Sequence, residues 1–449
     1  MASVTDVLVV GGGIGGLVAA WEFARAGRAV TVLEAAPVLG GKLRPGGEVG
    51  FDRGAESFAT RTTGVVDLIA DVGLDLTVVA PEPAPAHLVD LDSSGALRRL
   101  PLPRRTILGL PADPAAFDVA AIVGADGVAR ALLEPSAPPT GTEPSLYELA
   151  TQRFGAAVAD RLVQPLCLSV HSRSARDVRL SAVHPALWRA FTRSGSLTAA
   201  VAALAPDATA GAAVRGIVGG VWRLANELSR VLADLGVTLR SGAAVDRVEG
   251  HRVVLGTDPL PAETVVLATG PEAARSLLGL PPARPIAVVE NVTARLRAPE
   301  LDTHPVGTGV IVAPDVPTRA KALTHVSAKW AWAAERLTPG EHLVRLSARD
   351  AAHPPTGAPQ IAAEIAALTG VPVASAAIRE LTSTHWPDAL GGPDADVLAA
   401  CRQHGIVAVG AAASGTGLAA VIPHARAAAR AVLDHSAEPL SAPTLEVSA

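Results

Sequence analysis

Short apolar runs separated by glycines open the chain. Residues 4–10 form an apolar run typical of a buried strand, and residues 29–33 form a second one. Between them, residues 17–26 have helical character and end at Gly27, where glycine accommodates the left-handed backbone that closes a helix. The pattern predicts a βαβ unit whose second strand is followed by Glu34.

The rest of the chain alternates between helical and strand-like segments. Helices are expected at residues 145–166, 221–235 and 418–433. Strands are expected at residues 237–240, 253–255, 265–268, 286–297, 309–312, 320–328, 342–347 and 406–409. Proline-rich breaks at 81–85 and 134–144 delimit an inserted region, and the tail from residue 436 is expected to be frayed. The pattern predicts an α/β fold with two sheets.

Composition narrows the class of protein. The chain has 449 residues, of which 49% are hydrophobic and 18% charged, so two or three structural units can share a large core. The net charge is -5 and no basic block is present, which argues against a nucleic-acid partner. Cys167 and Cys401 are far apart and outside any metal-binding spacing, so no metal site is expected.

Targeting signals are the next consideration. The first ten residues contain no Lys or Arg, so a secretory signal is not expected, and the sparse cysteines fit a reducing cytoplasm. Residues 405–423 carry no charge, but their glycines, serine and threonine indicate a strand, a turn and a helix start. A cytoplasmic protein without an integral membrane segment is therefore expected. The sequence leaves the oligomeric state open, with a homodimer as one option.

The loop at residues 11–16 has the spacing of a dinucleotide-binding turn. Gly11 allows a tight turn, Gly13 allows the backbone to approach a pyrophosphate, and Gly16 allows the helix to pack against the strand. Ile14 and Gly15 complete the loop, whose helix N-terminus offers free N–H groups to phosphates.

Three further features bear on the cofactor, and the second and third favour FAD over NAD. Glu34 can accept ribose hydroxyls and would repel a 2′-phosphate. A second glycine loop contains Gly41, followed by the basic residues Lys42 and Arg44, which suit a phosphate or flavin. A third loop near the C-terminus contains Gly410, Gly417 and Leu418. A cofactor held by both ends of the chain is a long one, and NAD needs neither of the latter two loops.

Together, the three glycine loops and Glu34 resemble the flavin monoamine oxidase and phytoene desaturase superfamily. Within it, the segment at residues 52–58 (DRGAESF) is similar to one in protoporphyrinogen and coproporphyrinogen oxidases. Similar segments occur at residues 100–111, 161–166 and 327–330, so the resemblance covers about residues 5–434. The Ala-rich, Lys-poor composition is typical of an actinobacterial-like member.

The resemblance implies a Rossmann-like FAD-binding domain, an interleaved α+β substrate-binding domain and a helical insertion. The FAD-binding domain would comprise residues 1–80, 210–285 and 375–435. Residues 286–374 would form the substrate-binding sheet, residues 81–209 the rest of that domain with the helical insertion, and residues 436–449 a flexible tail.

The implied reaction is the oxidation of coproporphyrinogen III, or protoporphyrinogen IX, to the porphyrin in haem biosynthesis, with O2 as acceptor and H2O2 as product. The resemblance adds Val245 as a backbone contact to adenine. It places Arg61 where relatives hold a basic group for substrate carboxylates. Lys329 is a second candidate for the propionates, Ser169 belongs to the expected pocket, and His171 is a weak candidate for a base.

Two segments depart from the family pattern. Residues 169–171 read Ser-Val-His where relatives carry glycine and an aromatic residue, and residues 389–394 lack an expected tyrosine and histidine. An altered pocket leaves three alternatives open. One is an FAD-dependent oxidase or desaturase of another small molecule in a specialised pathway. Another is a binding protein that keeps the flavin fold without catalysis. The third is an NAD-dependent dehydrogenase.

Overall fold

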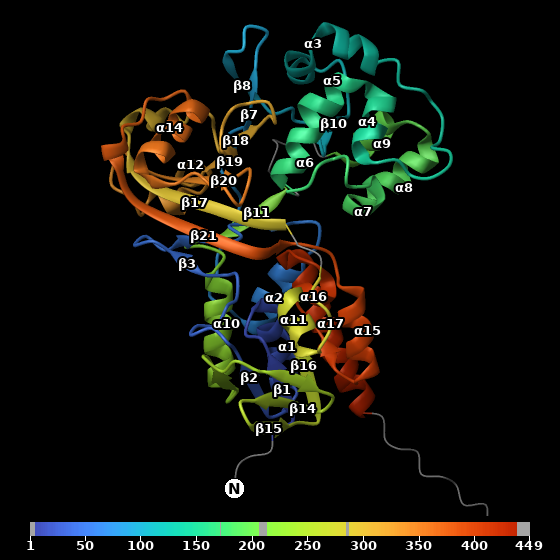
Figure 1. Cartoon of the computed structure of the whole chain (residues 1–449), viewed down its shortest axis with the longest axis vertical. Coiled ribbons are helices and arrows are strands. Elements are labelled where there is room, and N and C mark those ends of the chain that lie inside the picture. Colours follow the sequence, from blue (N-terminus) through green and yellow to red (C-terminus); the bar gives the residue numbers. More distant parts are fainter. Residues whose placement is uncertain (1–4, 171, 206–212, 284–286, 438–449) are drawn as a thin grey trace, which may run out of the picture.

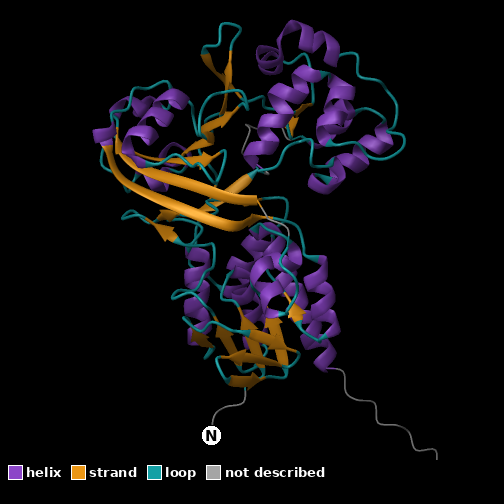
Figure 2. Ribbon diagram, in the orientation of Figure 1, coloured by secondary structure: helices purple, strands orange, loops and turns teal. Residues whose placement is uncertain are grey.

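The structure is a computed structural model that describes residues 5–170, 172–205, 213–283 and 287–437. A lobe built on a parallel sheet lies at one end of the molecule, and a second sheet lies beside a group of helices at the other end (Figure 1). Two long strands run along the boundary between the two ends (Figure 2). This α/β architecture with a parallel sheet confirms the fold class expected from the sequence.

The parallel sheet contains the predicted βαβ unit. Strand β1 (Val7–Val10) pairs with β2 (Val30–Leu33), and helix α1 (Ile14–Arg25) connects them. The sheet has the order β12-β2-β1-β16-β22, with β12 at Thr238–Arg240, β16 at Thr264–Leu267 and β22 at Val407–Ala408. The central strands β1, β2 and β16 are covered on both faces, which explains why their sequences are largely apolar.

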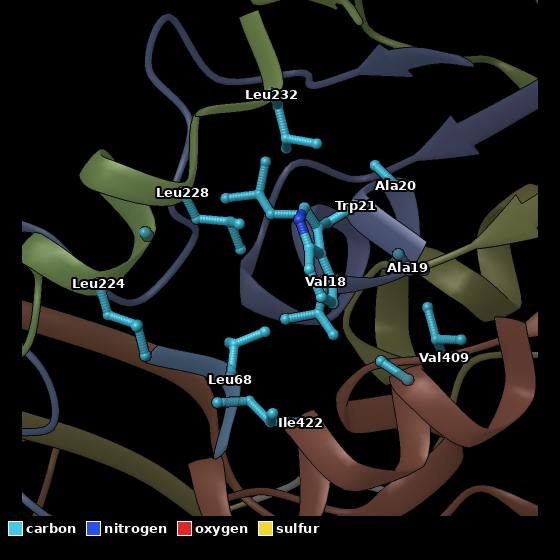
Figure 3. Close-up of a cluster of buried hydrophobic side chains, with 14 of the residues drawn as sticks. Val18, Ala19, Ala20, Trp21, Leu68, Leu224, Leu228, Leu232, Val409 and Ile422 are labelled. Carbon is cyan, nitrogen blue, oxygen red and sulfur yellow. The ribbon is translucent and has the colours of Figure 1, made fainter. Parts of the chain in front are cut away.

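Four helices bury one face of this sheet. They are α1, α2 (Gly64–Val72), α10 (Arg223–Asp234) and α17 (Leu418–Ala437). Trp21 of α1 lies in the core near Leu228 of α10 and Ile422 of α17 (Figure 3). Glu22 on α1 is fully buried, and its carboxylate accepts a hydrogen bond from Arg426 of α17 at 2.6 Å. The first and last helices of the lobe are thus held together by packing and by charge.

The opposite face of the parallel sheet carries a small antiparallel sheet and two helices. The strands are β13 (Arg247–Glu249), β14 (Arg252–Leu255) and β15 (Asp258–Pro261), and the helices are α11 (Pro271–Leu277) and α15 (Ala395–Gln403). Cys401 is buried on this side and Cys167 among the helices of the other end, and both thiols are free.

The second sheet has seven strands in the order β21-β17-β20-β19-β18-β7-β8. They are β7 (His87–Leu91), β8 (Leu97–Pro101), β17 (Ala287–Arg297), β18 (Gly309–Val312), β19 (Ala320–His325), β20 (Glu341–Ala348) and β21 (Ile378–Leu390). One face packs against α14 (Gly357–Thr369) through apolar side chains such as Leu346. The alternate positions Asn291 and Thr293 of β17 pair with Ser347 and Arg345 of β20, which places a polar row on the other face.

The structure corrects two expectations about this sheet. The strand expected at residues 320–328 ends at His325, and Val326–Lys329 form the short helix α12. Strand β21 belongs to the seven-stranded sheet, although residues 375–435 were assigned to the FAD-binding domain. Pro387 and the mixed polarity of β21 hide it in the sequence, and proline is tolerated there because β21 is an edge strand.

The helical group between residues 117 and 204 forms its own core. Its elements are α3 (Phe117–Ala131), α4 (Leu146–Phe154), α5 (Ala156–Val158), a π-helical turn at Ala159–Val163, α6 (Gln164–Val170), α7 (Leu180–Val183), α8 (Pro185–Ser194) and α9 (Leu197–Leu204). Ser145 and Glu148 cap α4 reciprocally, which fixes where the predicted helix at 145–166 begins. The π-helical turn at Ala159–Val163 interrupts the second half of the predicted helix.

A search for membrane-crossing helices among the described residues found none of sufficient length and apolar character. The uncharged segment at 405–423 is instead divided into β22, the four-residue helix α16 (Ala411–Ser414) and the start of α17. Glycines at 410, 415 and 417 have positive φ angles and break the segment at these places.

Candidate functional site

A main cavity of about 1910 Å³ extends from the carboxyl ends of the parallel strands to the polar face of the seven-stranded sheet. Single small-molecule pockets have volumes of about 300–1,000 Å³, so the main cavity has room for two molecules placed end to end. In doubly wound sheets, ligands bind beyond the carboxyl ends of the strands. The parallel-sheet end of the cavity therefore lies where a dinucleotide is expected.

The first glycine loop forms this end of the cavity. Gly11 has φ +106°, and a Cβ there would lie 2.9 Å from the carbonyl oxygen of Ala268. A Cβ at Gly16 would lie 2.0 Å from the carbonyl oxygen of Gly11. Glycine is thus required for the turn at Gly11 and for the packing of α1 at Gly16. Gly16 is not among the lining residues, so its part is structural.

Three other residues of this loop, Gly13, Ile14 and Gly15, line the cavity. The nearest atom to a Cβ at Gly13 would be 3.9 Å away, so a side chain there would not clash with the protein and would extend into the cavity. A Cβ at Gly15 would lie 2.8 Å from the Cα atom of Gly410, so these glycines bring two distant loops into contact. The free N–H groups at the start of α1 face a space that suits a phosphate.

Glu34 lies at the carboxyl end of β2 and lines the cavity. The backbone N–H of Gly12 donates to its Oε2 at 2.7 Å, and that of Ala36 donates to its Oε1 at 2.8 Å. These bonds hold the carboxylate in place and leave each oxygen a further lone pair for a ribose hydroxyl. Val245, expected near the adenine, lines the same part of the cavity.

The second glycine loop supports the first. The N–H of Gly40 donates to the carbonyl of Gly12 at 2.8 Å, and Gly41 and Lys42 line the cavity. Arg44 does not line it, in contrast to the expectation that it reaches the phosphate or flavin. Its Nε donates to the carbonyl oxygen of Gly41 at 2.8 Å, so the guanidinium braces the loop instead.

The C-terminal loop completes this end of the cavity through Gly410, Gly417 and Leu418. Of the thirteen residues expected to contact the cofactor, the structure therefore brings eleven to one cavity wall, leaving out Gly16 and Arg44. Because the glycines leave backbone exposed where side chains would intrude, this wall fits a long dinucleotide.

The other end of the main cavity is built from the seven-stranded sheet and the helical group. Asn291 and Ser347 line it, and the hydroxyl of Ser347 donates to Oδ1 of Asn291 at 2.8 Å. Among the described residues, Trp386 is the one aromatic ring of a Phe, Tyr or Trp on the cavity wall. Ser169, at the end of α6, lines the cavity as expected, and its hydroxyl donates to the carbonyl of Lys321 at 3.1 Å.

The two basic candidates for substrate carboxylates are in different surroundings. Arg61 lines the main cavity and is exposed. Lys329 lies outside it, in a side cavity of about 570 Å³ that also contacts Ser169. The ammonium group of Lys329 donates to Glu56 at 2.7 Å, so a structural ion pair already satisfies this charge. The weak base candidate His171 lies outside the described residues.

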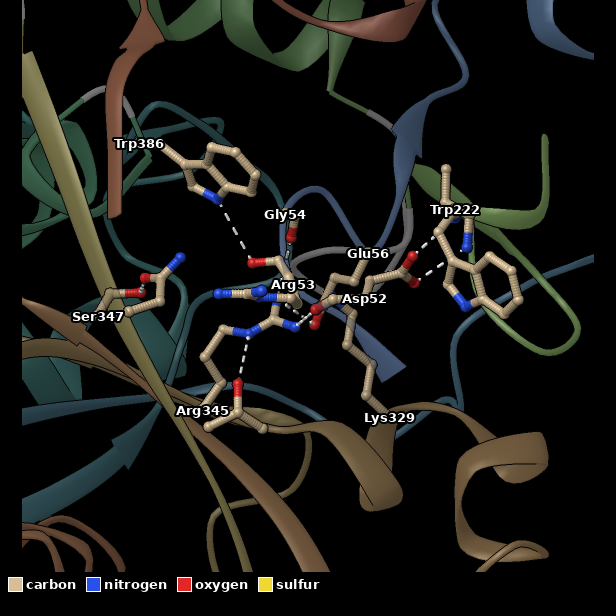
Figure 4. A network of polar contacts seen from close by, with 12 residues as sticks. Asp52, Arg53, Gly54, Glu56, Trp222, Lys329, Arg345, Ser347 and Trp386 are labelled. Atoms are coloured by element: carbon tan, nitrogen blue, oxygen red, sulfur yellow. Dashed lines mark hydrogen bonds and ion pairs between the residues drawn. The ribbon is translucent and has the colours of Figure 1, made fainter. Parts of the chain in front are cut away.

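Lys329 belongs to a buried network that joins the two ends of the molecule (Figure 4). Glu56 also pairs with Arg345 of β20 at 3.1 Å, and Arg345 donates to the carbonyl of Gly54 at 3.3 Å. Burial alone would raise the pKa of Glu56, but Lys329 and Arg345 hold it below its ordinary value. Residues of the segment 52–58 thus take part in the contacts that join the two lobes.

Asp52 completes this joint beside α10. Its carboxylate accepts hydrogen bonds from the backbone N–H of Val221 at 3.0 Å and of Trp222 at 2.8 Å, both at the helix N-terminus (Figure 4). Burial raises the pKa of Asp52 to about 7 against these bonds. Gly54 and Ala55, within the same segment, line the main cavity.

Sequence reasoning missed Lys321, which is 8% exposed and lines the main cavity. Its Nζ donates to the hydroxyl of Ser172. A lysine within the strand predicted at 320–328 was the available signal, because charged residues are rarely buried without a partner.

Comparison with known proteins agrees with this geometry. The chain matches the family described as flavin containing amine oxidoreductase over residues 14–384. It is 32% identical to the coproporphyrinogen III oxidase of Mycobacterium tuberculosis (strain ATCC 25618 / H37Rv) over 344 residues, which cover 72% of this chain and 73% of the relative. It is 30% identical over 202 residues to the chloroplastic protoporphyrinogen oxidase of Oryza sativa subsp. japonica, covering 43% and 35% of the two chains.

Solved structures show the same fold. A candidate protoporphyrinogen oxidase from Exiguobacterium sp. 255-15 superimposes with a TM-score of 0.78 at 22% identity, covering 97% of this chain and 100% of the other. Cyclohexylamine oxidase from Brevibacterium oxydans IH-35A gives a TM-score of 0.64 at 19% identity, covering 97% and 100%. The chain belongs to the flavin-containing amine oxidoreductase family and is a flavoenzyme.

Proposed function

We propose that the protein binds FAD and oxidises a porphyrinogen to the porphyrin, with coproporphyrinogen III as its substrate and O2 as the electron acceptor. The main cavity carries this proposal, because its dinucleotide-shaped end continues into a second space lined by Asn291, Arg61 and Lys321. The identity to coproporphyrinogen III oxidases, over about three quarters of the chain, supports the choice of substrate.

Residues at one end of the cavity would bind the cofactor, and residues at the other end would orient the substrate. The two N-terminal glycine loops would hold the pyrophosphate, and Glu34 the ribose. When bound, FAD supplies the capacity to accept a hydride. The side chains of the other end would orient the ring for transfer to the cofactor, and the surrounding walls would exclude water. The exposed Arg61 attracts the carboxylates of a substrate entering the cavity.

Rapid mixing under anaerobic conditions tests the proposal. The yellow protein is mixed with coproporphyrinogen III, and the flavin absorbance is followed. Bleaching of the flavin band, then porphyrin fluorescence and H2O2 once air is admitted, is the expected result. Protoporphyrinogen IX in a parallel experiment measures the preference between the two substrates. A flavin that stays oxidised with both porphyrinogens would overturn the assignment, and a colourless protein would overturn flavin binding.

A further inference from the structure

The two ends of the main cavity differ in charge. The charged side chains that line the parallel-sheet end are Glu34, Lys42 and Asp246. Among the described residues, the charged side chains that line the other end are Arg61, Arg173 and Lys321. An end with three cations and no carboxylate raises the local concentration of anions and favours a ligand that carries negative charge there.

Lys321 differs from the other two cations in its burial and its backbone. Arg61 and Arg173 are exposed, whereas Lys321 is 8% exposed. In the pairing of β19 with β20, Ala320 lies opposite Ala348 and Ala322 lies opposite Ser347, so Lys321 is an extra residue in β19. Such bulges redirect a side chain and are frequent beside active sites. Here the bulge lies next to the polar row that lines the cavity.

The ammonium group of Lys321 has an incomplete set of partners. It donates to the hydroxyl of Ser172, and no carboxylate of a described residue pairs with it. Burial, with a smaller contribution from the positive charge of Arg349, lowers the pKa of Lys321 to about 8. A buried charge without a counter-ion is costly, so its position on a cavity wall calls for an anion supplied by a ligand.

Ser172 is also held in an unusual state. Its φ angle is +48°, a left-handed conformation that is rare outside glycine. Because its oxygen accepts a hydrogen bond from Lys321, its own O–H remains able to donate. Strained residues of this kind gather at ligand-binding sites, where the surrounding structure maintains them.

We propose that Lys321 and Ser172 form an inner anchor for one carboxylate of the substrate. This inference rests on the proposed tetrapyrrole substrate. The ammonium group supplies the charge and the hydroxyl a second donor, so one propionate is fixed deep in the cavity. The exposed Arg61 and Arg173 are left to meet carboxylates nearer the solvent. The anchor thereby selects for substrates with a carboxylate at that ring position and orients the ring relative to the cofactor.

Variants of Lys321 test the anchor in the flavin-bound protein. Lys321→Met removes the charge at similar length, Lys321→Arg keeps the charge, and Arg230→Met removes one charge from the exposed surface of α10 as a matched control. The dissociation constant for coproporphyrin III, the reaction product, is measured by fluorescence titration, alongside KM and kcat for coproporphyrinogen III. Flavin absorbance and the thermal midpoint confirm that each variant folds.

Lys321→Met is expected to weaken coproporphyrin III binding and raise KM by about tenfold or more, as for loss of one charged hydrogen bond, with a smaller change in kcat. Lys321→Arg is expected to recover part of the affinity, and Arg230→Met to match the wild type. If the wild type is active and Lys321→Met has the same KM and dissociation constant as the wild type, the anchor is overturned and the proposed function stays intact.

Binding measurements separate the anchor from the proposed reaction. A wild type that oxidises no porphyrinogen, yet binds coproporphyrin III in a manner dependent on Lys321, would support the anchor and overturn the proposed oxidation. A wild type that neither oxidises nor binds the porphyrin would overturn both.

The pH dependence supplies a readout that a purely structural lysine would not show. Among the described residues, the Lys321 amine, whose pKa is about 8, donates to the hydroxyl of Ser172 and lies near the positive charge of Arg349. Deprotonation of the amine removes the charge that holds the carboxylate. Affinity for coproporphyrin III is therefore expected to fall as pH rises through about 8 in the wild type, and not in Lys321→Met. A parallel fall in both proteins would contradict the anchor.

Discussion

At residue scale, Gly13 and Gly16 are expected to have different roles, Gly13 in cofactor binding and Gly16 in folding. A Cβ at Gly16 would overlap the backbone oxygen of Gly11 at 2.0 Å, whereas a Cβ at Gly13 would meet only the Cα atom of Gly41 at 3.9 Å. Gly16→Ala is expected to destabilise the protein with or without flavin. Gly13→Ala is expected to fold normally and to weaken FAD binding by at least about tenfold, or about 1.4 kcal/mol.

Thermal unfolding of the flavin-free forms and flavin titration measure the two effects. Wild-type protein without flavin serves as the reference for folding. A glycine-to-alanine control at Gly73 would itself strain the backbone, because Gly73 has φ +74°. A Gly13→Ala protein with wild-type FAD affinity would show that the phosphates do not approach the backbone at this position.

At the scale of elements, Glu22 joins the first and last helices of the parallel-sheet lobe. Its carboxylate accepts hydrogen bonds from Arg426 at 2.6 Å and Arg430 at 3.0 Å, both on α17, and from Arg25 at 2.8 Å. Glu22→Gln leaves the buried Arg426 without this countercharge, so a loss of about 3 kcal/mol in unfolding free energy is expected. Denaturant unfolding at pH 7 measures it.

The stability that the Glu22 carboxylate contributes is expected to depend on pH. Burial raises the pKa of Glu22, but the arginines outweigh this and hold it below the ordinary value of 4.5. Its stabilisation is therefore present above that value and is lost as pH falls through the lower folded pKa. The difference between wild type and Glu22→Gln should shrink in acid. Glu227→Gln, which breaks the surface pair with Arg230, should cost no more than about 1 kcal/mol.

At the scale of the whole molecule, Glu56 connects the two ends of the protein through Lys329 and Arg345 (Figure 4). Glu56→Gln leaves both cations without their countercharge. Hydrogen exchange is expected to accelerate at residues 52–58, in α12 and along β20, because these segments share the network, while β1 and α1 keep their protection.

A second ion pair supplies the control for this experiment. Asp90 and Arg98 pair at 2.6 Å between β7 and β8, within one sheet. Asp90→Asn should accelerate exchange in β7 and β8 and leave residues 52–58 unchanged. Equal effects of both substitutions at residues 52–58 would show that Glu56 has no special part in holding the lobes together.

Local sequence was enough to predict which residues line the parallel-sheet end of the main cavity. The loop at residues 11–16, Glu34 and the helix that follows the loop are neighbours in the chain, so their geometry follows from turn chemistry and helix periodicity. The central strands β1, β2 and β16 were predicted for a similar reason, since burial on both faces produces largely apolar runs. The family also followed from the sequence, through the resemblance of segments such as residues 52–58.

Tertiary structure decided the substrate end, because its residues meet only through long-range pairing. Strand β21 is an edge strand whose partner β17 lies about a hundred positions earlier, and nothing local marks it. Lys329 and Lys321 are both lysines near β19, eight positions apart, yet one is neutralised by Glu56 and the other lines the main cavity. Which cation is left for a ligand depends on the carboxylates that folding brings beside it, and the sequence does not specify those neighbours locally.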